Sequence, residues 1–216
     1  MPYSRYFPTP LRLLILLLAT FIIVAPGYTQ AHSTAPMATG APDNTAGLLT
    51  ISQAYRAIPH RQSPFNPDRA KMSTDQKQYL TKLFMATDEA LRLRVETMRW
   101  FQTGGERGLA IQTYYPAMEF LIDELKKQDP PGRLTGISNL IIEALQAEQS
   151  YFNAWYETYD TQRRFNPKHK FVKRTHKNLK KAYDYLIQYF PFEPAENQQA
   201  FKDHLEALDF LSNKGF

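Results

Sequence analysis

The residues best suited to recognition chemistry form a cationic run between Arg163 and Lys181. Nine of the 26 Lys and Arg residues lie in this run, and no acidic residue occurs from Thr161 to Tyr183. Because all 21 acidic residues lie elsewhere, the rest of the chain is net acidic and the basic character is local. The cations of the run are Arg163, Arg164, Lys168, Lys170, Lys173, Arg174, Lys177, Lys180 and Lys181.

A helix that begins near Lys168 would gather most of these cations on one side. At 100° per residue, the cations from Lys170 to Lys181 fall within an arc of about 120°, almost opposite an apolar face that includes Val172. Like charges at this spacing repel one another. We expect the face to contact an anionic macromolecule, an acidic protein or lipid headgroups, which would offset that repulsion. The alternatives are a solvated face, or a face neutralised by acids of the last helix: Glu196, Asp203 and Glu206.

Two opposite charges fall inside the apolar stripes of different expected helices. Helical projection places Arg94 in the stripe of the first long helix and Glu148 in that of the third. Because an unpaired buried charge costs several kcal/mol, we expect the two to lie within salt-bridge distance. The pair is either structural, or the polar centre of a bundle cavity that binds a small ligand or cofactor. Binding of a small ligand or cofactor at this pair is the alternative to a function of the cationic face.

Other candidates for chemistry are few. The histidines are scattered, and neither an HExxH nor an ExxH motif occurs, so we predict no metal site and no cofactor. Two weaker possibilities are haem ligation by His176 or His204 with Met98 or Met118, and copper binding at His32 if cleavage exposes it. No GxSxG, Walker or GxGxxG motif occurs, and we predict that the protein is not an enzyme. The absence of cysteine excludes disulfides, thiolate metal sites and a lipoprotein anchor.

The first 31 residues have the features of a cleavable signal peptide. Arg5 and Arg12 precede an almost wholly apolar run from Leu13 to Ala25, and small residues precede a cleavage site between Ala31 and His32. We therefore expect export to the periplasm or the medium, with no membrane span after cleavage. An uncleaved anchor is the alternative, although the apolar run is shorter than the roughly 20 residues that a span requires. Export argues against nucleic acid as the normal partner.

The residues after the leader fall into three parts. Residues 32–47 are rich in Ala, Pro, Thr and Gly and predict a flexible linker. Residues 48–72 predict a short helix over 48–58, followed by an extended Pro-rich strap anchored by Phe65. A helical bundle domain occupies 73–216. It begins at a capping box in which the side chains of Ser73 and Gln76 bond to free amides at the helix start.

Four long amphipathic patterns and one shorter pattern define the domain. They extend from Ser73 to Gly104, from about Gly108 to Gln128, from Arg133 to Gln162, from about Lys168 to Phe190, and from Ala195 to about Leu211. Pro116 lies inside the second and predicts a kink. No strand pattern or internal repeat occurs. The predicted fold class is all-α, an antiparallel up-down bundle of four long helices with the fifth C-terminal helix and the N-terminal extended strap packed outside it.

Overall fold

The computed structural model describes residues 49–50, 63–102, 107–162 and 164–211. Within these ranges, the side chains of 49–50, 101–102, 107, 158–162 and 164–165 are not described. The predicted signal peptide (1–31) and linker (32–47) lie outside the described residues.

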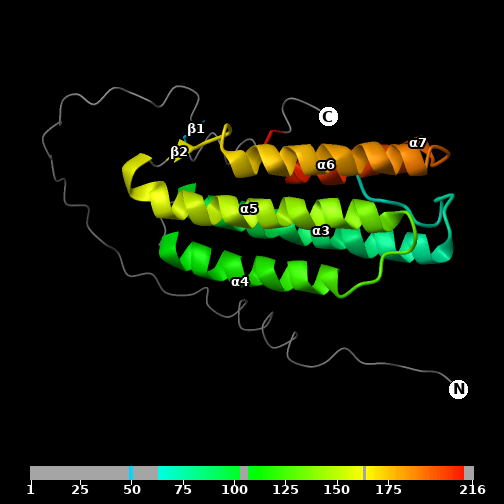
Figure 1. Cartoon of the computed structure of the whole chain (residues 1–216), viewed down its shortest axis with the longest axis horizontal. Coiled ribbons are helices and arrows are strands. Elements are labelled where there is room, and N and C mark those ends of the chain that lie inside the picture. Colours follow the sequence, from blue (N-terminus) through cyan, green and yellow to red (C-terminus); the bar gives the residue numbers. More distant parts are fainter. Residues whose placement is uncertain (1–48, 51–62, 103–106, 163, 212–216) are drawn as a thin grey trace, which may run out of the picture. The chain divides into compact units, whose positions relative to one another are not determined.

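The described part of the chain is helical, which confirms the predicted all-α class at this level (Figure 1). Its five helices are α3 (Thr74–Gln102), α4 (Arg107–Lys126), α5 (Leu134–Gln162), α6 (Lys170–Tyr189) and α7 (Ala195–Leu208). Each agrees with a sequence pattern to within a few residues. None of the described helices combines the length and apolar character needed to cross a bilayer.

A two-residue ladder joins distant parts of the chain. β1 (Leu49–Thr50) pairs antiparallel with β2 (Arg164–Phe165), so that Leu49 lies opposite Phe165. The prediction of a helix through residues 49–50 is therefore wrong, and residues 51–58 of the expected short helix lie outside the described residues. Two residues are too few for an alternating pattern, so the sequence carries no signal for this pairing.

The five helices contact one another in a closed order. α3 packs on α4, α4 on α5, α5 on α6, α6 on α7 and α7 on α3, and α3 also meets α5. The sequence-based expectation that the fifth helix packs outside four others is therefore wrong. This helix, α7, lies between α6 and α3. The cause is its fully buried apolar face, in which Phe201 and Leu205 are 0% exposed. That face completes the core.

The expected start of α3 is confirmed. The Ser73 amide donates to Gln76 Oε1 at 3.1 Å and the Gln76 amide to Ser73 Oγ at 3.4 Å, which is the capping box. Pro116 lies inside α4 as expected. On the same helix, Tyr115 is 41% exposed. Its predecessor Tyr114 is 1% exposed and takes the inward position.

The Pro-rich segment, residues 63–73, is fastened to α7 and to the turn before it. Phe65 packs on Phe84 and Phe201 at ring-centroid distances of 5.7 and 5.8 Å, as its predicted anchoring role requires. Asn66 and Asn197 exchange hydrogen bonds, with the Asn66 amide donating to Asn197 Oδ1 at 3.0 Å and Asn197 Nδ2 donating to the Asn66 carbonyl at 3.1 Å. A backbone held by an amide side chain in this way needs no regular secondary structure to satisfy its polar groups.

Candidate functional site

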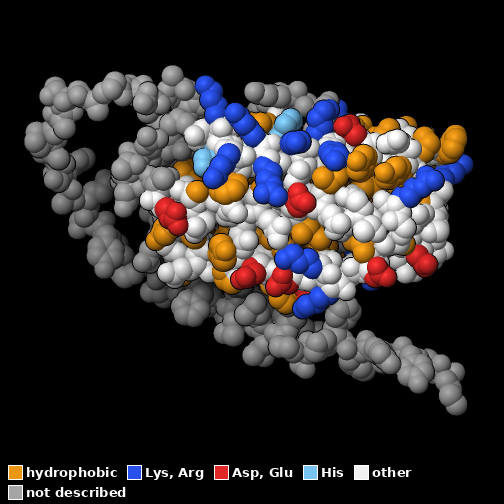
Figure 2. Space-filling view, in the orientation of Figure 1, with side chains coloured by type: hydrophobic (Ala, Val, Ile, Leu, Met, Phe, Trp, Pro, Cys, Tyr) orange, Lys and Arg blue, Asp and Glu red, His pale blue; other side chains and the backbone are white. Residues whose placement is uncertain are grey.

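The cations of α6 form an exposed surface, here called the basic face. Lys168, just before the helix, and Lys170, Lys173, Arg174, Lys177 and Lys181 are exposed, and Lys180 is partly exposed. Figure 2 shows Lys and Arg side chains gathered over α6, while several acidic side chains lie over the α4 side of the molecule. Neither α7 nor the Pro-rich segment removes these cations from solvent. Arg163 lies outside the described residues, and the side chain of Arg164 is not described.

The chain before α6 is held by neutral hydrogen bonds. The Asn166 amide donates to the Tyr151 hydroxyl at 2.9 Å, and the Lys168 amide donates to Asn166 Oδ1 at 2.9 Å. His169 is the N-cap residue, and its Nδ1 accepts from the Phe171 amide at 3.3 Å. Burial, followed by the Lys170 charge, lowers the pKa of His169. The ring therefore tends to stay neutral, as an accepting Nδ1 requires.

The basic face occupies an electrostatically unfavourable place on its helix. The first turn of α6 contains no acidic residue, and Lys170 and Lys173 lie near the positive end of the helix dipole. Repulsion among cations three and four residues apart adds to this cost. The first acid of α6, the exposed Asp184, lies about one turn beyond Lys181 and ends the face. The stability of α6 itself therefore does not explain why these cations lie together on one face.

Little charge compensation reaches the face from neighbouring helices. Arg174 lies 3.5 Å from Glu143 of α5, and none of the lysines of the face lies within 4.0 Å of a described carboxylate. Two lysines instead rest on aromatic rings: Lys170 Nζ is 5.0 Å from the Phe171 centroid and Lys181 Nζ is 5.4 Å from that of Tyr185.

The acids of α7 named as alternative partners of the face have partners elsewhere. Glu196 pairs with Arg69 at 2.6 Å and Glu206 with Lys202 at 3.6 Å. Asp203 accepts from the Ser63 amide at 3.3 Å. The described structure therefore favours an open basic face over a neutralised one.

Arg94 and Glu148 form a second cluster, inside the protein. Arg94 Nη1 lies 3.3 Å from Glu148 Oε2, within salt-bridge distance, and each side chain is 1% exposed. The Tyr114 hydroxyl donates to Glu148 Oε1 at 3.1 Å. Burial raises the pKa of Glu148, and Arg94 and the Tyr114 hydroxyl oppose that shift. The cluster joins side chains from α3, α4 and α5.

The Nη1 and Nη2 groups of Arg94 also bind the end of α7, whereas Nε has no hydrogen-bond partner among the described residues. Nη1 donates to the Leu208 carbonyl at 2.6 Å and Nη2 donates to the Ala207 carbonyl. The Phe210 ring lies 4.6 Å from the guanidinium carbon. Arg94 thus satisfies carbonyls that the last turn of a helix leaves without partners. Nothing in the spacing of Arg94 and Glu148 indicated these contacts, because they depend on where α7 packs.

The cluster has the geometry of a structural contact between helices. Its charged groups are enclosed, and they bond to one another, to Tyr114 and to the end of α7. A ligand at Arg94 or Glu148 would have to displace these protein partners. This geometry gives less support to the small-ligand alternative than to a role in stability.

The histidines named as possible haem ligands already contact other groups. His176 Nδ1 lies 2.6 Å from Oδ2 of Asp209, whose side chain is 1% exposed. His204 stacks on Phe84 with a centroid distance of 4.4 Å and an interplanar angle of 9°. Within the described ranges, no group of three or more His, Asp or Glu residues is placed to hold a metal ion. His32 lies outside those ranges. The His176–Asp209 contact is one that sequence spacing did not reveal.

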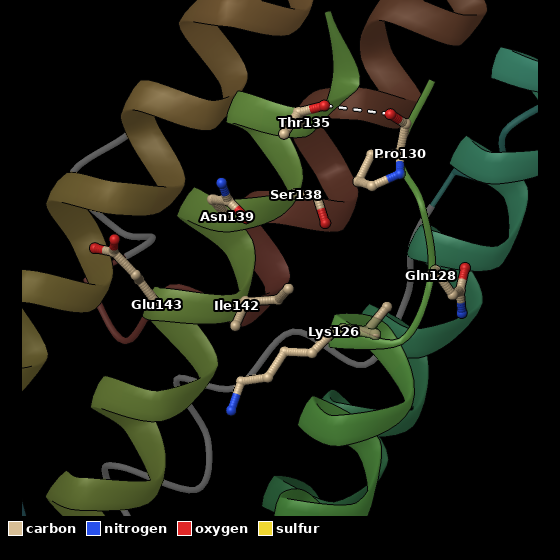
Figure 3. Close-up of a pocket in the computed structure, with 9 residues that line it drawn as sticks. Lys126, Gln128, Pro130, Thr135, Ser138, Asn139, Ile142 and Glu143 are labelled. Carbon is tan, nitrogen blue, oxygen red and sulfur yellow. Dashed lines mark hydrogen bonds between the residues drawn. The ribbon is translucent and has the colours of Figure 1, made fainter. Parts of the chain in front are cut away.

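A surface hollow of about 360 Å³ lies between the end of α4 and the start of α5 (Figure 3). Lys126, Ser138 and Glu143 are among its lining residues, and Thr135 Oγ1 donates to the Pro130 carbonyl at 3.2 Å at its rim. The Ser138 hydroxyl is already bonded to Tyr79 at 2.6 Å, and Glu143 also contacts Arg174 and accepts from Asn178. The polar groups of the hollow are thus largely used by the protein.

Comparisons with protein-family models, curated proteins and solved structures gave no match for this chain. Three local features are candidate sites: the basic face, the buried Arg94–Glu148 cluster and the hollow between α4 and α5. Of these, the buried cluster and the hollow have polar groups bonded within the protein, whereas the basic face presents charge to solvent. The basic face is the strongest candidate site.

Proposed function

We propose that this chain is an exported helical binding protein that contacts an anionic partner through the basic face. The main support for this proposal is the exposure of the α6 lysines, none of which lies within 4.0 Å of a described carboxylate. In this proposal α3, α4, α5 and α6 form an antiparallel up-down bundle with the Pro-rich segment as its strap, and the bundle supplies a rigid support for α6. The protein performs no catalysis; it acts by electrostatic capture.

The binding strength follows from the number of cations. A Lys or Arg close to an anionic surface contributes about 1 kcal/mol, so three lysines contribute about 3 kcal/mol, a factor of roughly 100 in affinity. Because these lysines are exposed, mobile ions screen them, and the Debye length shortens to about 3 Å at 1 M salt. Binding should therefore weaken steeply with ionic strength.

A charge-reversal pair of variants tests the proposal. The variant K173E/K177E/K180E changes the basic face, and the control K82E/K126E/K127E applies the same change of net charge to exposed lysines of α3 and α4 and the turn after α4. Binding to an immobilised polyanion and to anionic vesicles is measured over a salt series. We expect the first variant to lose at least 100-fold in affinity and the control to remain close to the parent. Equal losses in both variants, or salt-independent binding by the parent, would refute the role of the basic face.

A further inference from the structure

An apolar tip lies at the end of the helix that carries the basic face. It consists of Pro191 and Phe192, in the turn between α6 and α7, and both residues are exposed. The side chain of Phe192 is 84% exposed, more than any other large apolar side chain among the described residues. Isolated exposed apolar residues are common on protein surfaces, so the tip becomes informative only with its surroundings.

The tip is held in place by the residues around it. Glu193 is 5% exposed and accepts from Asn197 Nδ2 at 3.0 Å. Gln198 Nε2 donates to the carbonyls of Pro191 and Glu193 at 3.3 and 3.1 Å. Since the backbone on both sides of Phe192 is fixed, its ring points outward from an ordered turn. A preordered apolar group binds without the entropic cost of ordering a loop.

Half-buried aromatic rings connect the basic face to the tip end of α6. Tyr185 lies beneath Lys181 Nζ, and it stacks on Tyr189 with a centroid distance of 5.4 Å. The Arg133 guanidinium carbon lies 5.7 Å from the Tyr189 centroid. Tyrosine rings with cations beside them suit the boundary between lipid headgroups and acyl chains, where one part of the side chain is apolar and the other is hydrated.

We infer that the anionic partner of the basic face is a bilayer surface that contains acidic phospholipids, with Phe192 inserted at headgroup level. This inference rests on the proposed function and adds the identity of the partner. α6 would stay packed on the protein, about 30 Å long and lying along the bilayer. Its lysines would supply the attraction, and Phe192 would supply a shallow anchor.

Two observations favour a bilayer over a polyanion or an acidic protein. Apart from Arg174, which is near Glu143, the described basic face consists of lysines, which act as point charges without the planar fork that recognises one carboxylate or phosphate at a defined angle. The exposed Phe192 gains nothing from an anionic polymer in water, but it gains from transfer into an apolar boundary. A diffuse charged surface with an apolar layer beneath it satisfies both features.

The absence of cysteine allows a direct test with the purified protein. Phe192→Cys is labelled with an environment-sensitive fluorophore, and the matched control is Phe120→Cys, at a 54% exposed position on α4. Each is mixed with phosphatidylcholine vesicles with and without phosphatidylglycerol. We expect a blue shift, and quenching by brominated lipid, at position 192 alone and with phosphatidylglycerol alone. The unlabelled variant F192S should partition about tenfold less than the parent.

The outcomes separate this inference from the proposed function. Vesicle binding without a spectral shift at position 192, or with an equal shift at 120, would overturn insertion by the tip. Binding to soluble polyphosphate without vesicle binding would overturn the bilayer inference and leave electrostatic capture intact. Binding to neither would refute both.

Discussion

Replacing Arg94 with methionine should destabilise the protein far more than the same change at Arg92, two residues earlier on α3. Methionine keeps much of the side-chain volume but removes the donors to Glu148 and to the carbonyls of Ala207 and Leu208. The carboxylate would then stay enclosed, with the Tyr114 hydroxyl as its remaining described donor.

The expected cost follows from those contacts. Leaving one member of a buried ion pair without its partner costs about 3–5 kcal/mol. Each buried carbonyl that loses its donor adds about 1–3 kcal/mol. The total, about 5–11 kcal/mol, is comparable to the whole stability of an ordinary domain. Arg92 makes two salt bridges, to Glu89 and Glu96, but its side chain is 53% exposed, so its loss should cost about 0–1 kcal/mol.

Urea denaturation followed by circular dichroism measures this difference. Besides R94M and R92M, the double variant R94M/E148L removes the stranded carboxylate and should recover about 3 kcal/mol of the loss. The two carbonyls and the Tyr114 hydroxyl, which loses Glu148 as its acceptor, then remain as the main defects. If R94M does not fold, the comparison of R94M/E148L with R92M still measures the combined contribution of the two carbonyls and the Tyr114 hydroxyl. A loss below about 2 kcal/mol in R94M, or no recovery in the double variant, would refute the account of the cluster.

Two further predictions concern the Pro-rich segment and the pH dependence of stability. Asn197→Ala removes the paired hydrogen bonds to Asn66 and the hydrogen bond to Glu193. It should lower the free energy of unfolding by about 1–3 kcal/mol and speed proteolysis within residues 63–73. An unchanged cleavage rate would contradict this. Because burial raises the folded-state pKa of Glu148, its stabilising contribution is complete below the ordinary value of 4.5 and is lost as pH rises through the raised pKa. The free energy of unfolding of the parent should therefore fall relative to Glu148→Gln as pH rises above 4.5, and parallel pH curves from urea titrations would show that Glu148 does not contribute in this way.

The parts of the fold that the sequence predicted are those encoded by local spacing. Apolar residues three and four positions apart located all five helices, and the Ser73–Gln76 box located the start of α3. The same projection placed Arg94 and Glu148 in apolar stripes, and the cost of an unpaired buried charge made their pairing predictable. The position of the α6 cations opposite its apolar face could also be predicted, because both faces follow from the geometry of a single helix.

Tertiary structure decided where these faces meet. Periodicity identifies the apolar side of α7 but not the helices that will cover it, so its place between α6 and α3 could not be predicted. The bonds from Arg94 to the end of α7, between Asn66 and Asn197, and between His176 and Asp209 join residues with no characteristic spacing. Such polar contacts form only after packing has brought the segments together, which is why spacing along the chain does not encode them.

The candidate site divides in the same way. By itself the sequence determined that α6 would carry a row of cations opposite its buried face, since both follow from residue order and helical geometry. Only the tertiary structure decided that the row stays exposed, because it placed Glu196 beside Arg69 and Asp203 beside the Ser63 amide. It also decided that Phe192 points outward, because the buried Glu193 fixes the turn from the other side. Charge and periodicity are properties of the chain, whereas exposure depends on which neighbours the fold supplies.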